Sequence, residues 1–308
     1  MSWDRATLPK ETASIVRNGW TPIERGRNGP GFRELASSSG VARLANGLLR
    51  ELKQLPNSLT KSIADNQRGQ VDRDGADVSA DINRFRLISG YRSGDRRIEA
   101  GRDLFSIGSP EDAIFNLLDG WVALYTLLED GRRQIVQFAL PGAVLGLFPT
   151  RGAQATFGAQ ALTDTVLCVI PHSKLSEFTR DEPDIAMRLA RSLARDCNLA
   201  FDHMTSIGRR SARERVAHLL LELFVRYRAQ WPGHRIEEMC LPLTQEQIGD
   251  ATGLTFVHVN RVLRVLRKER IAEFHYRRLR ILDPDKLIEI AGIDPQIAMA
   301  WLDQRPGS

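Results

Sequence analysis

Cysteine is scarce in this chain of 308 residues, and no apolar run is long. Cys168, Cys197 and Cys240 are far apart and form no CxxC pair, which argues against a disulfide framework, a zinc knuckle and a conventional iron–sulfur site. The most apolar stretch, residues 138–149, is broken by Pro141 and two glycines, whereas a membrane helix needs roughly 18 apolar residues in succession. The N-terminus also lacks the basic and apolar segments of a secretory signal. We expect a cytoplasmic protein with no membrane partner.

Positive charge is concentrated in the C-terminal part of the chain. The net charge is +5, and residues 209–291 hold 16 Lys and Arg against 11 Asp and Glu. The rest of the chain is therefore balanced. A basic excess that is confined to one segment indicates a polyanionic partner.

Residues 1–80 are rich in Gly, Ser, Asn, Asp and Arg. Such a segment buries little apolar surface by itself. Within it, residues 41–55 place leucines at helical spacing (Leu44, Leu48, Leu49 and Leu52). We expect a mostly disordered extension that contains one amphipathic helix.

Residues 81–182 are expected to form a strand-rich domain. Short apolar stretches alternate with glycines, and five of them fit strands: Leu104–Ile107, Ile114–Leu118, Val122–Leu128, Gln134–Leu140 and Thr165–Ile170. The Asp130-Gly131 pair is the signal of a tight hairpin. Many short strands with no helices between them indicate a barrel. We therefore expect a β-roll followed by helices, an α+β fold.

A long helix is expected over residues 183–208. Apolar residues recur along it every three or four positions, at Ile185, Leu189, Leu193, Cys197, Ala200, Met204 and Ile207. A helix of about 25 residues spans about 37 Å, too long to hide on one small barrel. The stripe is explained most simply by an equivalent helix in a second subunit, with the first six of these residues at the dimer interface. Packing along its own barrel is the alternative.

Residues 209–291 carry the densest signals. Ser211 and Glu214 form a capping box that starts one helix, and Thr244 and Gln247 form another. Gly253 then supplies a sharp turn, and Thr255 caps a second helix that buries four residues: Val259, Val262, Leu263 and Leu266. Helix, glycine turn and helix is the helix-turn-helix plan, here with a recognition helix over residues 255–267.

The outward side of the second helix has the residue types that read DNA. Arg261 can donate two hydrogen bonds to guanine, Asn260 can bond a base edge or a phosphate, and Val257 can touch a thymine methyl group. Contacts to phosphates are expected from Thr244, Thr255, His258 and Arg264. Strands over residues 271–273 and 279–282 flank an expected wing, whose Arg277 and Arg278 are placed over the phosphodiester backbone. A small helical bundle that binds protein is the alternative.

With these residues placed, the chain from about Ile98 to Ala291 resembles the Crp–Fnr superfamily of bacterial transcription regulators. The most specific matches are residues 243–266 and 209–223. The resemblance implies a homodimer with an effector-binding β-roll, a long dimer helix and a winged helix-turn-helix domain that ends near residue 291, before a C-terminal tail over 292–308. It also implies a palindromic operator in double-stranded DNA, and RNA polymerase as a partner of an activator.

Departures from the family pattern restrict the effector. Leu147 stands where cyclic AMP-binding members have Glu, and Gln154-Ala155 stands where they have an Arg-Ser/Thr pair for the cyclic phosphate. A buried phosphate without its Arg loses a charge-assisted contact, so cyclic AMP is not expected. Oxygen-sensing members hold a cluster through N-terminal cysteines, and residues 1–167 contain none. Val257 replaces the Glu that many members carry, so the half-site is expected to differ from the common one.

Other functional classes were weighed on the same residues. A cupin-type enzyme needs several His and a carboxylate converging on a metal inside the barrel. All six histidines lie at or after the last expected strand: His172, His203, His218, His234, His258 and His275. We therefore expect no catalytic residue, metal site or identifiable cofactor. A haem- or redox-responsive sensor of the same architecture, using His172 or Cys197, is the alternative; for these two residues we expect a surface loop and core packing.

Overall fold

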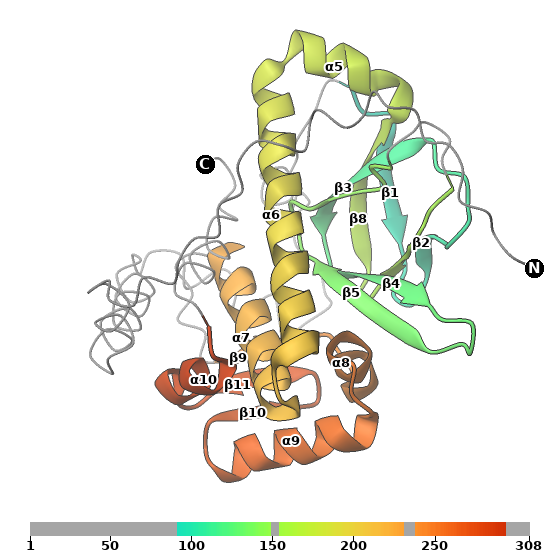
Figure 1. The fold of residues 1–308 in the computed structure, drawn as a ribbon. Coiled ribbons are helices and arrows are strands. Elements are labelled where there is room, and N and C mark those ends of the chain that lie inside the picture. Colours follow the sequence, from blue (N-terminus) through green and yellow to red (C-terminus); the bar gives the residue numbers. More distant parts are fainter. Residues whose placement is uncertain (1–90, 149–153, 231–237, 294–308) are drawn as a thin grey trace, which may run out of the picture. The chain divides into compact units, whose positions relative to one another are not determined.

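The computed structural model describes residues 91–148, 154–230 and 238–293 (Figure 1). The expected N-terminal extension, its helix over residues 41–55 and nearly all of the C-terminal tail lie outside the described residues. Within the described ranges, no helix combines the length and apolarity needed to cross a bilayer.

Eight strands form two four-stranded antiparallel sheets with the orders β1-β8-β3-β6 and β2-β7-β4-β5. The strands are β1 (Gly94–Ile98), β2 (Asp103–Phe105), β3 (Ala113–Asp119), β4 (Val122–Leu127), β5 (Arg133–Ala139), β6 (Val144–Leu145), β7 (Gly158–Ala161) and β8 (Thr165–Pro171). The five expected strands are confirmed as β2, β3, β4, β5 and β8. The strands β1, β6 and β7 were not expected, because one is polar, one has two residues and one consists of small residues.

Aromatic side chains fill part of the space between the two sheets. The ring centroid of Phe105 lies 6.1 Å from that of Phe115, 5.7 Å from that of Phe148 and 5.9 Å from that of Phe157. The hairpin between β4 and β5 turns at Gly131, which has a φ of 82° and donates its N–H to the Leu128 carbonyl at 2.9 Å. This confirms the expected Asp-Gly hairpin.

Two helices follow the strands. A short helix, α5 (Leu175–Asp181), precedes the long helix α6 (Pro183–Arg209). One face of α6 packs on the barrel, where Leu189 joins a buried cluster with Ile114 and Leu118. The expected helix and its proline start are confirmed, although the chain remains helical through Gly208.

The C-terminal part is helical with a small sheet. Its elements are α7 (Ala212–Gln230), β9 (Glu238–Cys240), α8 (Gln245–Thr252), α9 (Phe256–Lys268), β10 (Ala272–His275), β11 (Arg278–Ile281) and α10 (Pro284–Ala291). The three strands are antiparallel, with β11 between β10 and β9. The expected α+β architecture of a strand-rich domain, a long helix and a winged helix-turn-helix is confirmed.

Polar contacts join α6 and α7. The Asp202 carboxylate on α6 accepts from Arg210 at 3.3 Å and lies 2.9 Å from Nε2 of the buried His218 on α7. Burial by itself raises the pKa of Asp202, but the His218 hydrogen bond and the nearby Arg210 charge outweigh it and lower the pKa below its usual value. The two helices are therefore joined through an ionised carboxylate.

Gly249 sets how closely α8 approaches the turn before α9. A Cβ atom at this buried position would lie 2.5 Å from the Leu254 backbone oxygen. We predict that Gly249→Ala lowers the free energy of unfolding by roughly 1–3 kcal/mol, because backbone has to move. Gly208→Ala is the matched control: a Cβ there meets nothing within 4 Å, and alanine should gain about 0.5–1 kcal/mol in a helix. Thermal unfolding at one protein concentration measures both, and an equal effect of the two changes would contradict the close crossing.

Candidate nucleic-acid interface

The first helix of the pair starts at a complete capping box. Thr244 Oγ1 accepts the Gln247 N–H at 3.1 Å, and Gln247 Oε1 accepts the Thr244 N–H at 2.8 Å. The helix ends at Gly253, whose φ of 66° lies in the left-handed region that glycine adopts without steric cost. The predicted capping box and glycine turn are both confirmed.

The second helix, α9, presents one apolar face to the core. Thr255 caps it by accepting the His258 N–H at 3.4 Å. The four residues predicted to face inward are buried: Val259, Val262, Leu263 and Leu266. Burial of this face fixes which side chains point outward.

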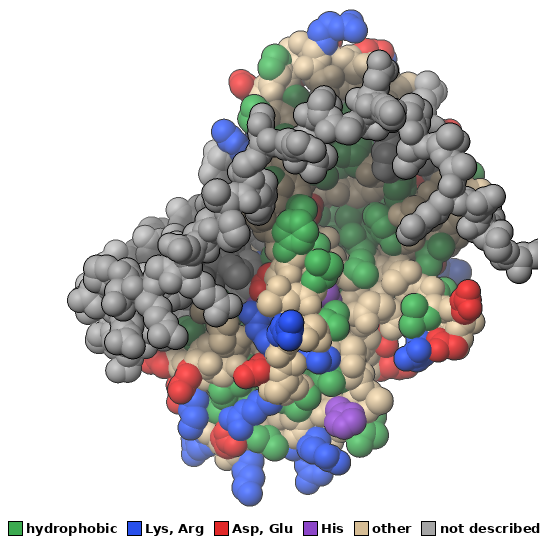
Figure 2. Space-filling view, viewed as in Figure 1, with side chains coloured by type: hydrophobic (Ala, Val, Ile, Leu, Met, Phe, Trp, Pro, Cys, Tyr) green, Lys and Arg blue, Asp and Glu red, His purple; other side chains and the backbone are tan. Residues whose placement is uncertain are grey.

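The outward face of α9 carries a basic stripe. Val257, Arg261, Arg264 and Lys268 follow one another at intervals of four, three and four residues, so they share one side of the helix. All four are exposed. Lys268 was not among the expected contacts, although the same spacing includes it. Figure 2 shows Lys and Arg side chains along the edge of the molecule formed by α9 and the small sheet.

Two expected contact residues are held by neighbours. His258 Nδ1 lies 2.9 Å from the Thr255 hydroxyl, and Asn260 donates to Gln245 Oε1 at 3.0 Å. Gln245 therefore orients Asn260 from the start of α8, which sequence spacing did not reveal. Phe256, at the N-terminus of α9, was also missed and is 55% exposed.

The wing turn is shorter than expected. Strands β10 and β11 pair up to His275 and Arg278, so only Tyr276 and Arg277 form the turn. Arg278 lies on the strand and not at the tip, and its guanidinium forms an ion pair with Glu238. Tyr276, which sequence reasoning missed, is 88% exposed.

Both turn residues of the wing have an unusual backbone. The φ angles of Tyr276 and Arg277 are 49° and 59°. Two-residue hairpin turns of this kind favour Asn-Gly because a Cβ is strained at positive φ. The turn therefore aims an arginine and a tyrosine into solvent at a conformational cost.

The two sides of α6 have different surroundings. Of the six residues expected at a dimer interface, Leu189 is buried in its own protomer and Ile185 packs beside it. The other four are exposed: Leu193, Cys197, Ala200 and Met204. Figure 2 shows apolar side chains along this helix, and Phe201, 57% exposed, was missed. Periodicity alone did not separate the two sides, because both are apolar.

The residues named for a haem or redox sensor occupy different settings. His172 is buried, and its Nε2 lies 3.2 Å from the Gly146 carbonyl oxygen, so the expected surface loop is wrong. Cys197 is exposed on α6, so the expected core packing is also wrong. In the ranges that the structure describes, no three His, Cys, Asp or Glu side chains are grouped as metal ligands.

Comparison with known proteins agrees with this geometry. Residues 95–182 match the cyclic nucleotide-binding domain, and residues 214–290 match the Crp-like helix-turn-helix domain. These two matches cover the strand-rich domain and the segment from α7 to α10.

Similar proteins come from several bacteria. The chain is 34% identical to the transcriptional activatory protein AadR of Rhodopseudomonas palustris, over 61% of this chain and 77% of that protein. It is also 34% identical to the nitrogen fixation regulation protein FixK of Rhizobium meliloti, over 66% of this chain and 86% of that protein. The structure of FixK2 from Bradyrhizobium japonicum matches with a TM-score of 0.58 and 29% identity, over 65% of this chain and 98% of that one. The chain is a non-enzymatic, DNA-binding transcription regulator and belongs to the Crp/Fnr family.

Proposed function

We propose that the protein is a homodimer that binds a palindromic operator, with α9 of each subunit in the major groove. The observation that carries this proposal is the outward face of α9, where exposed Val257 and Arg261 are followed by Arg264 and Lys268. The major groove of B-DNA, about 12 Å wide, admits an α-helix. The absence of acidic residues in the first turn of α9 leaves its positive N-terminal end open to phosphates.

Base reading is assigned to the N-terminal half of α9. Arg261 donates to guanine O6 and N7, while Val257 and the exposed Phe256 face thymine methyl groups. Asn260, oriented by Gln245, bonds a base edge or a phosphate. The remaining contacts are to phosphates, from Thr244, Thr255, His258, Arg264, Arg277 and Arg278.

Dimerisation is assigned to the exposed side of α6. Ala190, Ala194, Cys197, Phe201 and Met204 recur at alternating intervals of four and three residues and are all exposed. This is the spacing of a two-stranded coiled coil. A two-fold axis along this stripe places two recognition helices one DNA turn apart, about 34–36 Å, which requires a palindromic site.

An effector other than cyclic AMP is proposed for the barrel. Ala155, at the position of the family's phosphate-binding pair, is buried among apolar residues, and Gln154 pairs with Pro110 at the surface. Neither supplies the cation that a buried cyclic phosphate needs. The printed names of AadR and other relatives as activators support activation of transcription, with RNA polymerase as the partner.

Arg261→Ala tests base reading. It should weaken binding to a selected operator by roughly 1–3 kcal/mol and relax the preference at one base pair, because a bidentate contact to guanine is lost. Sites selected from random duplexes and titrated with wild type and variant provide the measurement. An equal loss on operator and unrelated DNA would contradict base reading by this residue.

Arg277→Ala tests the wing. It should weaken binding to all sequences alike and reduce the slope of log K against log salt by about 0.9 per subunit, the value for one phosphate contact. Arg97→Ala, which removes an exposed arginine from β1 of the barrel, is the control and should leave the slope unchanged. A wild-type slope for the Arg277 variant would exclude the wing contact.

Phe201→Glu combined with Met204→Glu tests the dimer. Facing carboxylates in the apolar stripe should convert the protein to a monomer in light scattering and should abolish tight operator binding. Ile107→Glu alters a barrel residue that is 40% exposed and should leave the dimer intact. A dimeric double variant would place the interface elsewhere.

A further inference from the structure

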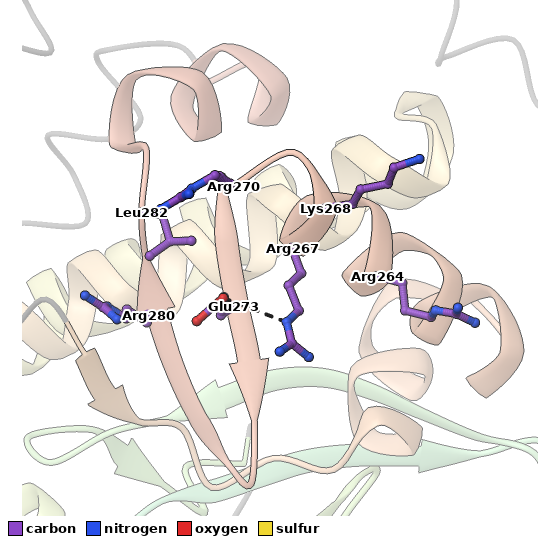
Figure 3. A pocket seen from close by; sticks show the side chains of 7 residues that line it. All are labelled: Arg264, Arg267, Lys268, Arg270, Glu273, Arg280 and Leu282. Carbon is purple, nitrogen blue, oxygen red and sulfur yellow. Dashed lines mark ion pairs between the residues drawn. The ribbon is translucent and has the colours of Figure 1, made fainter.

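A basic hollow lies beside the C-terminal end of α9, away from the residues assigned to bases. It encloses about 600 Å³, and seven residues line it: Arg264, Arg267, Lys268, Arg270, Glu273, Arg280 and Leu282. Figure 3 shows Arg264, Arg267 and Lys268 extending from α9, while Glu273 and Arg280 come from the small sheet. The hollow thus brings five cations together with one carboxylate.

The charge of this hollow is not balanced from within. Glu273 lies 3.8 Å from Arg267, and Arg264, Lys268 and Arg270 form no ion pair with another described residue. Like charges gathered in one concavity repel one another, and a bound polyanion removes this repulsion. The site therefore has the chemistry of a phosphate-binding surface.

The backbone at Arg270 is a second, independent observation. The Ile271 N–H donates to the Leu266 carbonyl at 2.9 Å, and the Arg270 N–H donates to the Arg267 carbonyl at 3.0 Å. This pair of bonds is the Schellman motif, which ends a helix with a left-handed residue that is usually glycine. Arg270 occupies that position with a φ of 56°. A long cationic side chain thus stands where the backbone favours no side chain at all.

We infer that this hollow, formed around Arg264, Lys268, Arg270 and Arg280, is a phosphate-binding site that extends the contact with duplex DNA along the backbone beyond the bases read by α9. The inference rests on the proposed placement of α9 in the major groove. Arg264 and Lys268 lie on the same side of α9 as Arg261, so the basic surface continues from the base-reading end to the hollow. Strain at Arg270 is accounted for by the position it gives to the guanidinium.

Arg270→Gly separates binding from folding. Glycine relieves the positive φ, so the Tm should rise by about 2–4 °C, while the salt slope should fall by about 0.9 for each subunit bound. Arg270→Lys keeps the charge and should restore the wild-type slope without the gain in Tm. A raised Tm with a wild-type slope would show that Arg270 contacts no phosphate and would overturn the inference.

The cations on either side are tested together. Lys268→Gln with Arg280→Gln should lower the slope by about 1.8 per subunit, whereas Arg96→Gln with Arg97→Gln, the same charge change on exposed residues of β1, should not. Phosphate ethylation interference should show phosphates that matter for wild type and not for the Lys268/Arg280 variant. An identical interference pattern would overturn the inference.

Two further arms separate other outcomes. Sodium pyrophosphate is titrated calorimetrically into wild type and Arg270→Gly; binding that the variant loses, with an unchanged slope on DNA, would assign the hollow to a free phosphorylated ligand and overturn the DNA contact. The slopes are measured on a selected operator and on an unrelated duplex. If wild type showed no preference between them, base reading by α9 would fail while the comparison of slopes would still test the hollow.

Discussion

The position of the helix-turn-helix depends on one buried cation, Arg226 on α7. This side chain is 3% exposed and donates to Glu222 Oε1 at 2.8 Å and to the Phe138 carbonyl of β5 at 2.8 Å. A buried charge costs several kcal/mol unless its partners stay in place. α7 is therefore held at one place on the barrel, and α8 and α9 pack against α7. The apolar cluster that contains Phe138 and Leu220 is continuous from β5 into the DNA-binding domain.

The strand β5 is consequently the part of the barrel that can act on the DNA-reading helix. Besides the contact at Phe138, Arg133 pairs with Asp250 of α8 at 2.8 Å, and Gln134 donates to the Ala251 carbonyl at 3.3 Å. These bonds reach the helix that precedes α9, so a shift of β5 changes either the contacts or the orientation of α9. A ligand of the barrel regulates DNA binding only if it binds the two arrangements with different affinity.

The sequence was most informative where a local rule has one solution. Capping boxes at Ser211 and Thr244 and the turn at Gly253 were predicted because side chains and backbone there satisfy the same few N–H groups. Strand β6, with two residues, carries too little pattern to be predicted, and the two apolar sides of α6 could not be distinguished by spacing. The pairing of Asn260 with Gln245, and the hollow around Arg270, arise from tertiary placement that spacing does not encode.

Strain follows function in the DNA-binding domain. Among the described residues, positive φ outside glycine occurs at Arg270, Tyr276 and Arg277, and a left-handed residue with a Cβ costs about 1–2 kcal/mol. All three lie between the end of α9 and the start of β11, and two are arginines. Glycine or asparagine would relieve the strain at each position, yet neither carries charge or an aromatic ring. The same segment is therefore less stable than its backbone allows, and the difference is explained by side chains that face a polyanion.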